Sequence, residues 1–165
     1  MGSVMASASS SLSRYSWAYR AIGWAGLLAG CLDITAALVE SGLERRSPVH
    51  LFQGIAGGLL GMSSFQGGLA TAALGAFFHF LIAITASAVF YFASRKLKFL
   101  VKHAISSGLL YGLAVYIFMY YIVLPLSAYH VRIALPPMAQ LVRDMAIHMF
   151  MVGLPISLMV RKYSD

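Results

Sequence analysis

Residues 68–93, GLATAALGAFFHFLIAITASAVFYFA, decide the fold. This stretch contains no Asp, Glu, Lys or Arg, and it is followed at once by the basic residues Arg95, Lys96, Lys98 and Lys102. A helix needs roughly 20 apolar residues to cross a hydrocarbon core about 30 Å thick. The stretch therefore predicts a membrane-spanning helix that ends at a charged boundary.

The composition of the whole chain points the same way. Of its 165 residues, 60% are hydrophobic and only 10% are charged. Soluble domains are about 45–50% apolar and about 25% charged, so an ordinary soluble domain and a disordered chain are both excluded. The length allows about four or five crossings with short loops and no sizeable domain outside the membrane.

Four spans are predicted within a single four-helix transmembrane domain of residues 17–162, so the fold class is an all-α, polytopic membrane protein. The spans cover about 17–39, 68–93, 104–124 and 141–160. Residues 1–16 are rich in Ser and Ala, which predicts a flexible cytoplasmic tail. Residues 48–62 are too short to span and predict an interfacial or re-entrant helix, capped by Ser47. A strained full span over residues 49–66 is the alternative.

The basic residues predict the orientation. With four spans and a cytoplasmic amino terminus, eight basic residues lie inside (Arg14, Arg20, Arg95, Lys96, Lys98, Lys102, Arg161 and Lys162) and four outside (Arg45, Arg46, Arg132 and Arg143). Cytoplasmic loops carry the excess of Lys and Arg, so both termini are expected in the cytoplasm. Five spans would separate the basic clusters. The net charge of +7 then indicates contact with lipid headgroups rather than nucleic acid.

Glycine pairs spaced four residues apart predict where helices approach closely. The pairs are Gly26 and Gly30, Gly54 and Gly58, Gly57 and Gly61, and Gly108 and Gly112. This spacing places both glycines on one helix face, where two backbones can come together. The face could join two copies of the chain, but packing within one bundle is the commoner use.

Polar residues within the spans are the candidate site. Counting 1.5 Å per residue from the span ends places them in one layer of the outer half: Asp33, His79, Tyr116, Tyr120, Asp144 and His148. One hypothesis is that Asp33, His79 and His148 form a site responsive to protons or ions. The other, commoner in helix bundles, is that hydrogen bonds among these residues fix the helix register.

Other chemistry has weak support in the sequence. Two histidines on separate spans, His79 and His148, are a weak signal for haem, and Asp33, Asp144 and His148 are a weak signal for a metal. Motifs for zinc proteases, phosphate-binding loops, dinucleotide binding and nucleophile elbows are absent. We therefore expect no enzyme, no cofactor and no metal. Leu28 to Cys31 matches a lipobox, but the apolar run continues to Val39, which favours an uncleaved span. Lipidation of Cys31 remains open.

Several short motifs carry a resemblance to known proteins. They are Gly26–Gly30 with Asp33, Phe65–Gly68, Leu124–Leu126, Pro136–Pro137, Ile147–Ile156 and Arg161–Lys162. In Gly26–Gly30 with Asp33, Phe65–Gly68 and Ile147–Ile156 the chain resembles a family of small uncharacterised bacterial inner-membrane proteins with four spans. In its glycine-rich first span, Leu124–Leu126, Pro136–Pro137 and the last-span histidine followed by Arg161–Lys162, it more loosely resembles the YagU-like proteins. The resemblance implies a bacterial inner membrane and carries over no catalytic residue or ligand.

Two functions follow as hypotheses. The first is a non-enzymatic accessory or interaction protein of the inner membrane, acting through its glycine faces. The second is a small proton- or ion-responsive transporter built on Asp33, His79 and His148. The expected partner is the lipid bilayer, with a homo-oligomer as an open alternative and no nucleic acid.

Overall fold

The computed structural model describes residues 2–129 and 136–164, with side chains from Trp17 onward. The secondary structure of the described part is all helical, with turns and short loops between the helices and no strand. His130 and Arg132, in the predicted loop before the last span, lie outside the described residues. The elements are α1 (Gly2–Leu43), α2 (Pro48–Leu60), the 3-10 helix η1 (Gly61–Gln66), α3 (Gly68–Lys96), α4 (Phe99–Lys102), α5 (Ala104–Phe118), the π-helix η2 (Met119–Val123), α6 (Leu124–Leu126), α7 (Met138–Ile147), the π-helix η3 (His148–Gly153) and α8 (Leu154–Lys162).

Four continuous helical segments are long and apolar enough to cross a membrane: Trp17–Leu43, Gly68–Lys96, Ala104–Leu126 and Met138–Lys162. They hold between 23 and 29 residues, which is about 35–44 Å of helix at 1.5 Å per residue. The prediction of four apolar helices is confirmed, with boundaries that differ by a few residues. Helix α1 begins at Gly2, within the stretch for which the sequence predicts a tail.

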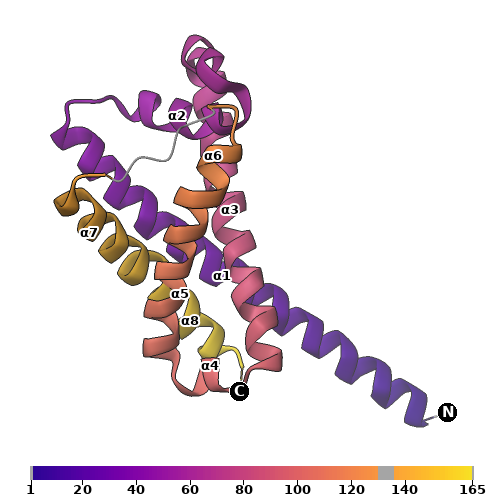
Figure 1. The fold of residues 1–165 in the computed structure, drawn as a ribbon. Helices are drawn as coiled ribbons and strands as arrows, with labels where there is room; N and C mark the ends of the chain where they lie inside the picture. Colours follow the sequence, from indigo (N-terminus) through magenta and orange to yellow (C-terminus); the bar gives the residue numbers. More distant parts are fainter. Residues whose placement is uncertain (1, 130–135, 165) are drawn as a thin grey trace.

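Helix α2 lies across one end of this bundle, while α4 and the end of α8 lie at the other (Figure 1). We call these the α2 end and the α4 end. The Oγ of Ser47 accepts a hydrogen bond from the His50 N–H at 3.2 Å, and Pro48 occupies the first turn. Gly61 ends α2 with a φ of +61°, a region that glycine enters at little cost. A short helix therefore caps the bundle instead of spanning it.

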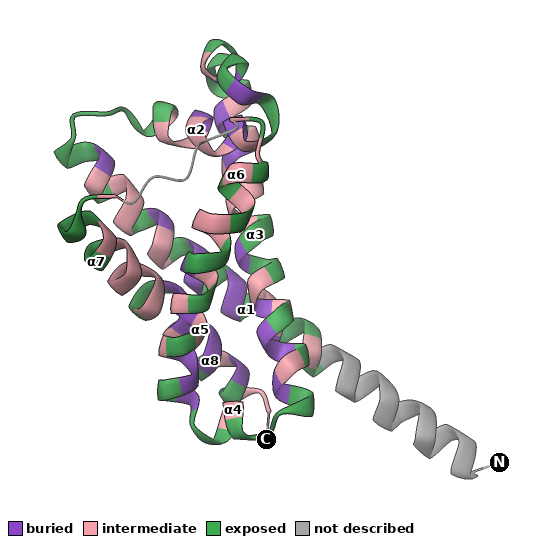
Figure 2. Ribbon diagram, viewed as in Figure 1, coloured by how far each residue is buried: buried purple, intermediate pink, exposed green. Residues whose placement is uncertain are grey.

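A buried hydrophobic core lies toward the α4 end. Ala21, Ala25 and Ala29 follow one another at four-residue spacing on α1 and are fully buried against a cluster that includes Phe90 and Ile156. Figure 2 shows buried residues along the inner faces of the helices and exposed residues on the outer faces. Small side chains let the helices approach closely, which maximises dispersion contacts where lipid supplies no hydrophobic drive.

Buried hydroxyls tie these helices together. Ser87 Oγ donates to the Ile22 carbonyl at 3.0 Å, Ser157 Oγ to the Ala104 carbonyl at 2.8 Å, and Tyr111 Oη to the Ala86 carbonyl at 2.7 Å. Each bond joins two different helices. These three hydroxyl groups thus find their hydrogen-bond acceptors within the chain.

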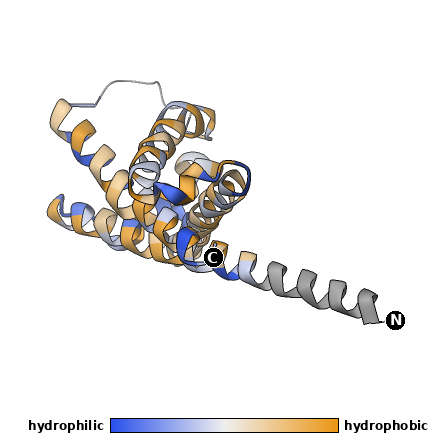
Figure 3. Cartoon of the chain, turned by 90° about the horizontal axis from the view of Figure 1, so that it is seen from below, coloured by the Kyte–Doolittle hydropathy of each residue, from blue (hydrophilic) through white to orange (hydrophobic). Residues whose placement is uncertain are grey.

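Large apolar side chains also cover the outside of the long helices. Phe77 is 60% exposed, Phe92 63% and Leu110 66%. Hydrophobic residues surround the long helices rather than facing only inward, as seen from the α4 end (Figure 3). An apolar outer surface of this extent is typical of a protein whose solvent is lipid.

The two π-helices each precede a proline. Pro125 stands two residues after η2, and Pro155 two residues after η3. Proline offers no N–H to the preceding turn, and a wider π turn accommodates this loss without ending the helix. The third apolar helix accordingly continues to Leu126, whereas the sequence predicts a stop at Pro125.

Candidate functional site

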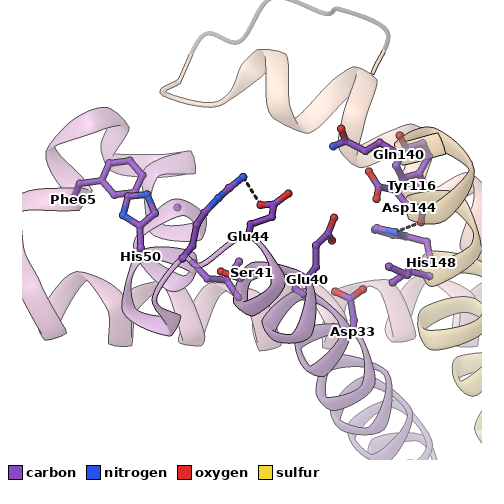
Figure 4. A pocket seen from close by; sticks show the side chains of 15 residues that line it. Asp33, Glu40, Ser41, Glu44, His50, Phe65, Tyr116, Gln140, Asp144 and His148 are labelled. Atoms are coloured by element: carbon purple, nitrogen blue, oxygen red, sulfur yellow. Dashed lines mark hydrogen bonds and ion pairs between the residues drawn. The ribbon is translucent and has the colours of Figure 1, made fainter. Parts of the chain in front are cut away.

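A cavity of about 430 Å³ opens at the α2 end between α1, α2 and α7. Helix α1 supplies one wall, and Tyr116 of α5, Asp144 of α7 and His148 of η3 supply the opposite wall (Figure 4). His50 of α2 and Phe65 of η1, whose rings stack with centroids 4.5 Å apart, line another side. The cavity lies at the end of the bundle away from the tightly packed core.

Acidic residues are concentrated in this cavity. The chain has only five Asp and Glu residues, and four of them line it: Asp33, Glu40, Glu44 and Asp144. Asp33 and Glu40 come from α1, and Glu44 directly follows its last residue, Leu43. Glu40 and Glu44 follow Asp33 by seven and eleven residues, a spacing that places all three on one helix face. The convergence of four of the five carboxylate side chains on one cavity makes it the candidate binding site.

Arginines neutralise three of the four carboxylates. Arg46 pairs with Glu44, and Arg143 pairs with Glu40 and also reaches Asp144, its Nε lying 3.4 Å from Oδ1. Within the described part of the chain, the carboxylate of Asp33 makes no ion pair or hydrogen bond. Asp33 is therefore the acidic side chain that faces the cavity without a counter-charge.

Two buried hydroxyls in the cavity wall also lack partners. Tyr116 is 4% exposed and Ser41 6%, and neither Tyr116 Oη nor Ser41 Oγ has a hydrogen-bond partner among the described residues. A buried polar group left unsatisfied costs about 1–3 kcal/mol. Both residues line the cavity, so a polar occupant would recover this cost.

His148 presents one ring nitrogen to the cavity region. Its Nδ1 lies 2.9 Å from the carbonyl of Asp144, one turn earlier. Because a carbonyl only accepts, Nδ1 carries the proton in this bond and Nε2 of the neutral ring is left as an acceptor. The ring meets Tyr116 edge-on with centroids 5.3 Å apart, and Tyr116 in turn stacks on Tyr120 at 5.8 Å.

The structure separates the residues that depth alone places in one layer. Asp33, Tyr116, Asp144 and His148 line the cavity, and Tyr120 lies behind Tyr116. His79 does not line it: the His79 Nε2 lies 2.9 Å from the Gly30 carbonyl and joins α3 to α1. The predicted trio with Asp33 and His148 is therefore not assembled around this cavity.

Sequence reasoning left Glu40, Ser41, Glu44 and Gln140 out of the candidate site, although all four line the cavity. The signal for the two glutamates was present, because Glu40 and Glu44 repeat at helical spacing after Asp33. Among the described residues, no group of three or more His, Cys, Asp or Glu side chains is arranged to hold a metal ion. Asp33, Asp144 and His148 line the same cavity but do not form such a group.

The candidate packing glycines fall into two groups. A Cβ atom on Gly26 would lie 2.6 Å from Ile84 Cα, and one on Gly30 2.9 Å from Phe80, so this pair faces α3. Gly108 and Gly112 face the last span in the same way, at Leu154 and Met149. Gly54 and Gly58 meet nothing within 4 Å. On α2 the close contacts fall instead on Gly57, against Tyr129, and Gly61, against Ala128.

Comparisons with known proteins do not assign this chain to a family. The chain matches no protein-family model, and searches among curated proteins and solved structures found no similar protein. The function has to be inferred from the cavity and its surroundings.

Proposed function

We propose that this chain is an integral protein of a bacterial inner membrane, with four spans and both termini in the cytoplasm. Its apolar outer surface supports insertion. The α4 end gathers seven basic residues of the described chain (Arg20, Arg95, Lys96, Lys98, Lys102, Arg161 and Lys162), while the four cavity carboxylates lie at the α2 end. The rule that cytoplasmic ends are positive supports this orientation.

We further propose that the protein is a small ion-responsive transporter whose cation site is the cavity at the α2 end. One observation carries this proposal: the Asp33 carboxylate faces the cavity without a counter-charge, and two buried hydroxyls in the wall of the same cavity, Tyr116 Oη and Ser41 Oγ, have no partner among the described residues. A cation entering the cavity would pair with Asp33, and the hydroxyls would accept hydrogen bonds from its hydrogens or its hydration water. His148 belongs to this site, whereas His79 serves helix packing.

The π-helix η3 supports movement at the site. It begins at His148, and its wider hydrogen-bond register offers an alternative to the α-helical one at the same residues. A change of register would rotate His148 relative to Asp33. This segment is therefore the proposed moving part.

The accessory hypothesis has less support. Six of the eight candidate packing glycines are occupied by contacts within the chain, which leaves only Gly54 and Gly58 open to a partner.

Ion flux in proteoliposomes tests the transporter proposal. An imposed gradient of at least one small cation, among protons, sodium, potassium and an organic ammonium ion, should drive a flux that Asp33→Asn abolishes. Thr35→Ala is the matched control, because Thr35 lies two residues away on α1 and bonds only the Cys31 carbonyl of its own helix. Absence of flux, or equal flux in Asp33→Asn, would overturn the proposal.

A further inference from the structure

We propose that the physiological occupant of the cavity is a linear aliphatic diammonium ion, with two ammonium groups joined by a short methylene chain. This inference rests on the proposed cation site and adds the chemical class of its ligand. It is carried by the spacing of charged and apolar residues along the α1 wall.

The α1 wall alternates charge and apolar surface. Asp33 and Glu40 are seven residues apart, which is about 10 Å along the helix axis. Ala37 lies between them on the same face and also lines the cavity, as do Leu51 of α2 and Ile147 of α7. A carboxylate, an apolar stretch and a second carboxylate match an ammonium, a methylene chain and a second ammonium.

The uncharged polar groups of the wall suit N–H donors. An ammonium group has three donors and no acceptor. Asp33, Tyr116 Oη and His148 Nε2 offer acceptors at the inner end of the cavity, and Ser41 Oγ offers one beside Glu40. The stacked rings of Tyr116 and Tyr120 add an aromatic surface, which favours a cation.

The size of the cavity disfavours a bare ion. Its volume of about 430 Å³ falls in the range of small-molecule pockets, roughly 300–1,000 Å³. Among the described residues, no three His, Cys, Asp or Glu side chains are arranged to hold a metal ion. An elongated organic cation fills this space better.

The ion pair between Arg143 and Glu40 does not prevent a ligand ammonium group from binding Glu40. Arg143 holds Glu40, but the Arg143 side chain is 46% exposed, and solvated ion pairs contribute little. Arg143 also reaches Asp144, so it can keep that partner while a ligand ammonium takes its place on Glu40.

Calorimetric titration of the purified full-length protein in nanodiscs tests the inference. The probes are diaminobutane, n-butylamine and sodium chloride. We expect saturable binding of diaminobutane, at least tenfold tighter than n-butylamine, and a loss of at least tenfold in Asp33→Asn. Thr35→Ala should bind as the wild type does. Ala37→Leu places bulk between the two carboxylates and should weaken diaminobutane without weakening sodium.

The outcomes separate the two proposals. If sodium or n-butylamine binds as tightly as diaminobutane and Asp33→Asn abolishes that binding, the diammonium inference is overturned and the cation site stands. If no probe binds, or if Asp33→Asn binds all of them unchanged, both proposals are overturned.

Discussion

Buried hydroxyl groups have hydrogen-bond partners near one end of the bundle and lack them near the other. Near the α4 end, Ser87 and Ser157 are fully buried and each hydroxyl joins two helices. Near the α2 end, Ser41 and Tyr116 are also buried, but their hydroxyls have no partner among the described residues and face a cavity. A hydroxyl at one end stabilises the fold, whereas a hydroxyl at the other end is available to a ligand.

The largest expected effect comes from adding a methyl group at Gly153, where the last span packs closely against α5. A Cβ atom on Gly153 would meet the backbone of Gly108 and Gly112, with Gly112 Cα at 2.6 Å. Overpacking costs about 1–3 kcal/mol, so Gly153→Ala should lower the thermal stability of the detergent-solubilised protein. Gly23 meets nothing within 4 Å, and Gly23→Ala should raise stability by about 0.5–1 kcal/mol. Equal effects of the two substitutions would contradict the packing described here.

The second prediction concerns the cost of the unpaired carboxylate. Asp33→Asn removes a charge that has no counter-ion among the described residues, so in the absence of ligand it should stabilise the protein by about 1 kcal/mol. Denaturation midpoints in nanodiscs without added cations measure this effect. A large destabilisation would assign Asp33 a structural role and contradict the site.

The third prediction compares two serines directly. Ser87→Ala removes a bond between helices and should cost about 0.6 kcal/mol, the average for such bonds in membrane proteins. Ser41→Ala removes no hydrogen bond and relieves the cost of a buried hydroxyl without a partner, so it should raise stability by about 1 kcal/mol while weakening ligand binding. The comparison fails if both variants lose the same stability.

The smallest expected effect belongs to His79. His79→Phe loses the contact between His79 Nε2 and the Gly30 carbonyl and should cost about half a kcal/mol. Because His79 lies outside the cavity, its substitution should not alter diaminobutane binding. An altered affinity for diaminobutane would show that His79 contributes to the site.

The sequence predicts the helices well because the decisive signal is local. An apolar run of sufficient length can satisfy its backbone in lipid only as a helix, and the run over residues 68–93 does so within Gly68–Lys96. The end at Pro125 is less predictable. Whether a proline stops a helix or is absorbed by a π turn depends on the neighbouring turns, which composition does not reveal.

The site is predicted only in part because depth does not determine rotation. The rise per residue places His79 and Asp33 at comparable heights, but the direction in which His79 points depends on how α3 packs against α1. Glu40 and Ser41 lie just after the predicted end of the first span, so the sequence alone indicates only that they mark the membrane boundary. The fold of α7 over this end is what turns them into a cavity wall.

The central claim has two parts. The α2 end holds a water-accessible, negatively charged cavity, and the buried core around Ala29, nearer the α4 end, is inaccessible to water. Single cysteines at Ala37, in the cavity wall, and at Ala29, in the core two turns away on the same helix, test it in a Cys31→Ser background. Oriented vesicles are treated from the outer face with membrane-impermeant thiosulfonates, one cationic and one anionic. We predict that Ala37→Cys reacts, faster with the cationic reagent, and that Ala29→Cys does not react. Equal labelling of both positions, or no preference for the cationic reagent at Ala37→Cys, would contradict the account.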